Sequence, residues 1–236
     1  MRSLFFCFGL LLMAQMACAQ YNTLHIPDTL AGPTFNLAMR DTFTQLLPGN
    51  QTITAGINGN FWGPTLIFNK WDTVYMNVHN QLNDTSTLHW HGFHLPAVMD
   101  GGPHQVIPPG TVWQPYWRVI NNAGTYWCHP HLHEHTAEQV VMGLGSLIIV
   151  RDSAEAALAI PRTYGVDDIP VVIPDREFSP ANQFNIKPYG DTVLVNGTLN
   201  PEQDIPAQVV RLRILNASPE RSYVLGFSDN RSFSVI

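Results

Sequence analysis

The feature that most restricts the fold of this 236-residue chain is a series of short extended runs between Leu24 and Val150. The runs are rich in Val, Ile, Thr and aromatic residues, and Gly, Pro and Asn separate them, which is the pattern of short strands joined by turns. In "DTVYMNVHN" the apolar residues alternate from Val74 to Val78, and His79 falls on the opposite face. The pattern predicts an all-β domain, either a sandwich or a barrel.

The series ends in a run without alternation. "LGSLIIV", residues 144–150, is continuously apolar, which is typical of a strand buried on both faces. Just before it, Thr136 and Gln139 have the spacing of a capping box, and Gly143 can end a helix. We therefore expect one helical turn followed by a fully buried strand.

After Arg151 the pattern changes. "DSAEAALAI" favours a short helix that Pro161 ends, and the repeated prolines of "GVDDIPVVIPD" are typical of a linker. Strands resume at "DTVLVNG" and at "VVRLRILNAS", where charged and apolar residues alternate. We predict a first domain at residues 20–150, a linker at 151–175 and a second β domain at 176–236. A sandwich domain takes about 100 residues, so the second domain is expected to be incomplete.

The first 19 residues are expected to be a cleaved export signal. A basic residue precedes an apolar run, and Ala17-Cys18-Ala19 has the A-x-A arrangement of a cleavage site. The apolar run is shorter than the ~20 residues of a membrane-spanning helix. A lipoprotein cut before Cys18 is the alternative, but Gln15 stands where a lipobox has a branched apolar residue. We expect a periplasmic or secreted protein.

Composition and cysteine content further restrict the class of protein and the partners that it can bind. Cys7 and Cys18 lie in this signal, so Cys128 is the only cysteine of the mature chain and no internal disulfide can form. With 45% hydrophobic and 13% charged residues, the chain has the composition of a globular protein. The net charge of −6, with no block of Lys or Arg, argues against nucleic acid and anionic membranes as partners.

Histidines occur at alternating positions in two segments. "TYWCHPHLHEHT" contains a run of four, and "LHWHGFH" contains an H-x-H pair; they include His89, His91, His129, His131, His133 and His135. In an extended segment, residues two apart share a face, so two pairs on adjacent strands can bring four nitrogens together. Imidazole ligands without thiolate or carboxylate suit copper or zinc, and copper(II) binds more tightly in the general affinity order. We predict a metal site.

Four motifs in order, "HWHG", "DGGPHQVIPPG", "TYWCHPHLH" and "GLGSLIIV", resemble those of the multicopper oxidases, above all the bacterial copper-efflux oxidases and laccase-like enzymes. The similarity extends from about Asn58 to Ile236. It implies cupredoxin-like (plastocyanin-like) Greek-key β-sandwich domains, one complete and a second truncated. It also implies one-electron oxidation of a reducing substrate coupled to four-electron reduction of dioxygen to water. Dioxygen and a small-molecule or metal-ion substrate would be the partners.

The resemblance also implies roles for particular residues. His89 would bind the type 2 copper, and His91, His129 and His131 would bind the type 3 pair, which is half of a trinuclear cluster. Asp100 matches an acidic residue thought to orient water and relay protons, although Asp-Gly-Gly-Pro is turn chemistry on any fold.

Four further histidines and two tryptophans near these motifs give weaker evidence of a role in the metal site. His94, His104, His133 and His135 fall outside the implied ligand set, since Pro130 favours a strand end. Trp90 and Trp127 flank the ligands and are expected to wall the site, but aromatic packing accounts for them equally well.

Cys128 is expected to be a packed thiol. A type 1 copper site would require a preceding His, where Trp127 stands, and Met or Leu where Glu138 stands. The type 1 copper and the substrate pocket would then lie in a further domain, and the 236-residue chain alone is expected to show no turnover. Phenols, cuprous ion, bilirubin-like pigments and other metal ions all stay open as substrates.

Two other interpretations use the same histidines. One is a non-catalytic copper-binding or copper-tolerance module, which would lack a type 1 site altogether. The other is a cupin-like mononuclear enzyme with an H-x-H pair and a nearby Glu. The interval from His131 to Glu134 is too short for that pattern, and a cupin needs no second histidine pair.

Overall fold

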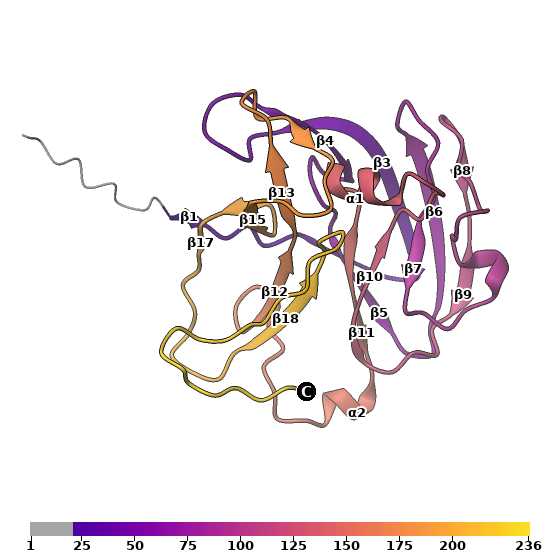
Figure 1. Ribbon diagram of the computed structural model, residues 1–236. Coiled ribbons are helices and arrows are strands. Elements are labelled where there is room, and N and C mark those ends of the chain that lie inside the picture. Colours follow the sequence, from indigo (N-terminus) through magenta and orange to yellow (C-terminus); the bar gives the residue numbers. More distant parts are fainter. Residues whose placement is uncertain (1–20) are drawn as a thin grey trace, which may run out of the picture.

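The computed structural model describes residues 21–236 and is mostly β, as predicted (Figure 1). The predicted export signal at residues 1–19 lies outside the described residues. Two five-stranded sheets form the first β region, residues 29–151. One sheet has the order β2-β5-β11-β10-β7, with the bounds Thr29–Ala31, Thr65–Asn69, Ser146–Arg151, Gly124–His129 and His89–His91. The other has the order β4-β3-β6-β8, with the bounds Thr52–Ile57, Thr34–Thr44, Thr73–Gln81 and Val112–Trp113, and β9 (Tyr116–Arg118) also pairs with β6.

The two sheets enclose one large hydrophobic cluster, which includes Phe35, Leu37, Phe68 and Trp117. The alternation predicted for β6 is confirmed, because Val74, Met76 and Val78 are buried while the residues between them are partly or fully exposed. A period of two therefore fixes which face of this strand meets the core.

Strand β11 is buried on both faces, as its continuous apolar run predicted. Ile148 and Val150 pack in the core of the first β region. Leu147 and Ile149 point the other way, into a second cluster with Trp62, Val172 and Ala217. Strand β11 thus joins the first β region to the rest of the molecule, and Figure 1 shows β10 and β11 between the two halves.

Helix α1 (Thr136–Met142) ends at Gly143, whose φ of 115° is left-handed, as expected. The predicted capping box is wrong: the residue preceding the helix is His135, and no side chain caps the helix. The Gln139 side chain instead bonds to the hydroxyl of Ser86 and donates to the Thr85 carbonyl. The glutamine that a capping box would need is therefore hydrogen-bonded to polar groups elsewhere in the chain.

The second β region, residues 168–217, consists of smaller sheets. Strand β12 (Asp168–Ile173) pairs in parallel with β18 (Arg211–Asn216). A four-stranded sheet has the order β14-β13-β15-β16, with the bounds Phe184–Asn185, Asp175–Phe178, Thr192–Val195 and Thr198–Leu199. The short strands β1 (Asn22–Thr23) and β17 (Pro201–Glu202) pair in parallel. The remaining elements are α2 (Ser153–Ala156), which is the predicted short helix, and the 3-10 turn η1 (Ala97–Met99).

Two features of the second β region differ from what its sequence pattern suggests. Residues 168–173, inside the predicted linker, form β12, because Pro170 removes only one ladder donor while Ile169 and Val172 are buried. In β18 it is Arg213 that is buried, and Leu212 and Ile214 are exposed. Within residues 21–236, no helix is both long and apolar enough to cross a membrane.

Candidate metal centre

The register of β7 and β10 assembles the candidate site. His129 pairs with His89, and Trp127 pairs with His91, so their four side chains share one face of the sheet. The pair between them, Cys128 and Trp90, points into the hydrophobic core. A slip of one residue would exchange these faces, so the buried Trp90 fixes the position of the histidines.

Three histidines converge closely. The nearest ring nitrogens of His89, His91 and His129 all lie within 4.8 Å of one another. Nδ1 of His91 is 3.1 Å from Nε2 of His129. Two imidazole nitrogens bound to one zinc-like ion at about 2.0–2.1 Å lie about 3 Å apart, so this pair has the spacing of two ligands of one ion.

Hydrogen bonds at the far side of two rings select their tautomers. Nδ1 of His89 lies 3.0 Å from the Asp100 carbonyl, and Nδ1 of His129 lies 2.7 Å from the Pro130 carbonyl. A carbonyl can only accept, so each Nδ1 carries the proton and each Nε2 keeps its lone pair. This is the arrangement found for histidines that bind metals.

His131 borders this group without joining it. Its ring centroid is 5.4 Å from that of His89 and 5.9 Å from that of His129. The backbone N–H of His131 donates to the hydroxyl of Thr87 at 2.6 Å, and Thr87 is fully buried. The structure therefore brings three of the four sequence-predicted ligands into one close group and holds the fourth beside them.

Burial and the neighbouring imidazoles favour the neutral form of His91 and His129. Burial lowers the pKa of His129 to about 3, and the neighbouring His89, His91 and His131 act in the same direction. Burial also lowers the pKa of His91, with His89 and His131 contributing. Neutral imidazole is the form that binds a metal, so His91 and His129 are in the form that ligates at neutral pH.

Asp100 contacts the ring of His89. Its carboxylate oxygen Oδ2 is 3.3 Å from Nδ1 of His89, and its carbonyl accepts from the same nitrogen. The chain reaches this position through Gly101, whose φ is 74°. A Cβ at Gly101 would lie 1.8 Å from the carbonyl oxygen of Leu88, so only glycine lets the turn approach β7 this closely.

The two tryptophans beside the ligands have different surroundings. Trp127 stacks on His129, with 4.0 Å between ring centroids, and also contacts His91. Trp90 is fully buried and packs against Trp117, so packing in the core accounts for it and it does not wall the site. Trp62 stacks on the outer side of Trp127, and no local sequence pattern indicated it.

The remaining sequence candidates lie apart from the close group. His133 and His135 are exposed and lie beside Glu134 and Glu138 respectively. Neither His94 nor His104 belongs to the metal-compatible group found among the described residues. The chain leaves its extended path at Glu134, whose φ is 65°, so the alternation of the histidine run ends there.

Cys128 is a free, fully buried thiol in the hydrophobic core. Burial raises its pKa to about 12, so the sulfur stays protonated. Because the thiolate is the form that binds metals, this environment agrees with a packed thiol.

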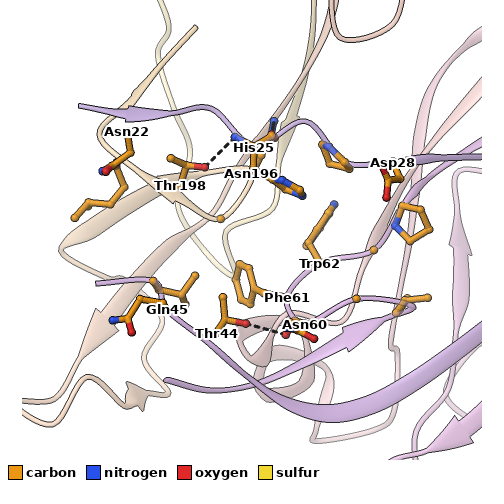
Figure 2. A pocket seen from close by; sticks show the side chains of 18 of the residues that line it. Asn22, His25, Asp28, Thr44, Gln45, Asn60, Phe61, Trp62, Asn196 and Thr198 are labelled. Atoms are coloured by element: carbon orange, nitrogen blue, oxygen red, sulfur yellow. Dashed lines mark hydrogen bonds between the residues drawn. The ribbon is translucent and has the colours of Figure 1, made fainter. Parts of the chain in front are cut away.

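A cavity of about 1160 Å³ is bordered by Trp62 (Figure 2). It is lined by both polar and aromatic side chains, including those of His25, Asn60, Phe61 and Asn196. None of the four predicted ligands lines it.

Comparisons with known proteins agree on one family. The family model described as "Multicopper oxidase" matches residues 22–155. The multicopper oxidase mco of Staphylococcus aureus is 39% identical over 199 residues, which is 82% of this chain and 44% of that protein. The cell division protein FtsP of Escherichia coli is 33% identical over 242 residues, which is 98% of this chain and 51% of that protein.

Solved structures extend the similarity to the fold. A laccase from Pediococcus acidilactici superposes with a TM-score of 0.80 at 35% identity, over 86% of this chain and 47% of that one. A McoA multicopper oxidase from Aquifex aeolicus gives 0.78 at 33% identity, over 84% of this chain and 46% of that one. The fold is thus cupredoxin-like, as the resemblance implied, and the chain spans about half the length of the curated relatives it matches.

Proposed function

Because the chain belongs to the multicopper oxidase family, we propose that it supplies copper ligands to an oxidase that couples one-electron oxidation of a reducing substrate to reduction of dioxygen to water. The observation that carries this proposal is the convergence of His89, His91 and His129, with His131 beside them, on one face of the β7–β10 pair. Neutral imidazoles are ligands suited to copper.

The four histidines take the roles implied by the family pattern. His89 holds the type 2 copper, and His91, His129 and His131 hold the type 3 pair. The 3.1 Å between Nδ1 of His91 and Nε2 of His129 supports a shared ion. Bound copper supplies one-electron steps, several of which are needed to reduce dioxygen fully. The protein holds the rings, fixes the tautomers of His89 and His129 through the Asp100 and Pro130 carbonyls, and lowers the pKa of His129 by burial.

Asp100 provides a proton-carrying group at the edge of the cluster. Its carboxylate is about one-third exposed and lies against Nδ1 of His89, so it can exchange protons with solvent. We assign it the proton delivery to oxygen and the orientation of water near His89. A carboxylate is suited to this because it can hold a water molecule and can pass a proton.

The location and substrate follow from the same family. The protein is exported to the periplasm or secreted, which agrees with the predicted leader at residues 1–19. Its reducing substrate is a small molecule or a metal ion. Among residues 21–236 the one cysteine, Cys128, is buried in the hydrophobic core, so we assign no type 1 copper to the described residues.

Metal analysis of histidine variants tests the ligand set. The chain is loaded with copper and dialysed as wild type, as a His91→Ala/His129→Ala double variant, and as a His133→Ala/His135→Ala control. The control removes two imidazoles that are exposed and outside the close group. We expect the first variant to lose copper and the control to keep it. Equal copper in all three proteins contradicts the assignment, and retained copper without oxygen consumption in the full oxidase indicates a binding module.

Asp100→Asn tests the proton role in the active oxidase. The amide is nearly isosteric and can still accept from His89, but it cannot carry a proton. We expect copper content to persist and reoxidation of the reduced enzyme by oxygen to slow by about 10²- to 10⁴-fold. Stopped-flow absorbance measures the rate. An unchanged rate would leave Asp100 as a turn residue.

A further inference from the structure

Three aromatic rings form a stack that leads away from the candidate metal centre. His129 lies 4.0 Å from Trp127 between ring centroids, with planes 27° apart. Trp127 lies 6.2 Å from Trp62, with planes 13° apart. Trp127 is half-buried and has aromatic contacts with both the ligand ring of His129 and Trp62. The position of Trp127 depends on both neighbours.

The backbone around Trp62 is built to hold its ring in this place. Trp62 has a φ of 61°, a left-handed conformation that costs energy for a bulky residue. Its N–H donates to the Gly143 carbonyl at 2.8 Å, and the next N–H donates to the Gly145 carbonyl at 2.7 Å. A Cβ at Gly145 would lie 2.7 Å from the Trp62 ring, so the glycine makes room for the indole.

Hydrogen bonding does not explain why the ring is held there. Trp62 is 5% exposed, and its indole N–H is buried without a partner. Figure 2 shows the Trp62 indole at the border of the cavity, and its N–H has no hydrogen-bond partner among the described residues. A buried donor without a partner and a left-handed backbone both cost stability. What this costly conformation of Trp62 provides is a contact between its ring face and Trp127.

We propose that Trp62 is a positioning residue for the metal-binding ring of His129, acting through Trp127. The inference rests on the proposed copper site. Besides the neighbouring imidazoles, the Pro130 carbonyl and the face of Trp127 hold the ring of His129 in place. Without Trp62, space opens in the cluster that contains Leu147 and Ile149, and Trp127 can move into it and away from His129. The Nε2 lone pair of His129 would then lose its fixed direction.

The experiment compares substitutions of two tryptophans that share an unusual backbone. Trp62→Leu removes the stacked ring, and Trp62→Phe restores an aromatic face. Trp71→Leu is the matched control, because Trp71 also has a left-handed φ, 79°, but is exposed and lies beside Lys70 and Arg118. Copper affinity is measured by chelator competition, the copper(II) geometry by EPR, and the His129 ring resonances by NMR without metal.

We expect Trp62→Leu to bind the same amount of copper about 10-fold more weakly, since residues that orient a metal ligand typically contribute 10- to 100-fold. Its EPR spectrum should broaden, and the His129 ring signal should broaden in the metal-free protein. Trp62→Phe should recover most of the affinity, and Trp71→Leu should match wild type. These three results together support a positioning role, because an aromatic ring at residue 62 would then be what restores the copper affinity.

Two outcomes overturn the inference. One is a folded Trp62→Leu protein with wild-type copper affinity, EPR spectrum and His129 resonances. The other is equal loss in Trp62→Leu and Trp71→Leu. If Trp62→Leu does not fold, Gly145→Ala pushes on the same ring from its other contact and should weaken copper binding in the same direction, with no change contradicting the inference. A wild-type chain that binds no copper refutes the proposed function, while the metal-free NMR comparison still tests the stack.

Discussion

The first and second β regions bury different kinds of side chain. Within residues 29–151, all of which the structure describes, no Asp, Glu, Lys or Arg is buried. The second β region buries four charged residues in a much shorter segment, Asp168, Asp175, Arg176 and Arg213. Its apolar contacts are made largely with Trp62, Leu147 and Ile149, which belong to the first β region. One region carries its own hydrophobic core, and the other depends on paired charges and on its neighbour.

The buried charges of the second β region are all bonded. Arg213 donates to both carboxylate oxygens of Asp168, at 2.7 and 2.8 Å. Arg176 donates to the Val140 and Val141 carbonyls at the end of α1, at 2.9 Å each, which ties the second β region to the first. A buried pair adds little net stability over apolar residues of equal size, but losing one partner is costly. The second β region should therefore be the more fragile of the two.

Of the changes that test this difference between the two β regions, Asp168→Asn is expected to have the largest effect. The change leaves Arg213 buried with no anion, which typically costs about 3–5 kcal/mol. Hydrogen exchange should rise in β12 and β18 while β6 stays protected. Asp229→Asn, which breaks an exposed pair with Arg231, is the control and should change neither. A uniform rise across both regions would mean that they unfold as a single unit.

The pH dependence of the unfolding free energy tests the contribution of a buried histidine in the first β region. The pKa of His129 is about 3 in the folded protein, below the ordinary 6.5, because burial disfavours the charged ring. Between these values the unfolded chain binds one more proton, so the unfolding free energy falls as pH falls, by at most about 1.4 kcal/mol per pH unit. Denaturant melts of the metal-free chain from pH 7 to pH 4 measure this slope. His129→Gln should flatten it and His79→Gln should not; equal slopes in all three proteins would locate the acid sensitivity elsewhere.

The smallest effects come from two neighbours on β11 that face opposite regions. Ile148 packs in the core of the first β region, and Ile149 packs in the cluster shared with the second. Each Ile→Val change should cost about 0.5–1.5 kcal/mol. We expect Ile149→Val to raise hydrogen exchange in β12 more than in β6, and Ile148→Val to affect both. The opposite order would show that the stability of the second β region does not depend on this contact.

Sequence patterns predicted what depends on neighbours along the chain. The alternation of β6, the doubly buried β11 and the closing glycine of α1 follow from local periodicity and backbone preference. The two histidine pairs were also visible, because residues two apart on a strand must share a face.

Features that depend on distant partners could not be predicted. β12 was placed in the linker because its prolines suggested a break, while its partner β18 lies far along the chain. Gln139 was assigned to a cap, but a buried hydroxyl at Ser86 bonds to it instead. Trp62 and Trp127 lie far apart in the sequence and meet only when the first β region has folded, so no local pattern indicates their contact.

The two-sided burial of β11 has a consequence for how the protein is made. A ribosome completes β11 before it synthesises β12 and β18, and at about 5–20 residues per second the 66 residues from 152 to 217 take roughly 3–13 s. During that interval the faces of Leu147, Ile149 and Trp62 that pack against Val172 and Ala217 in the folded protein lack those partners. The nascent chain thus carries a temporary adhesive surface, and a chaperone or an exported, unfolded state would protect it until the second β region arrives.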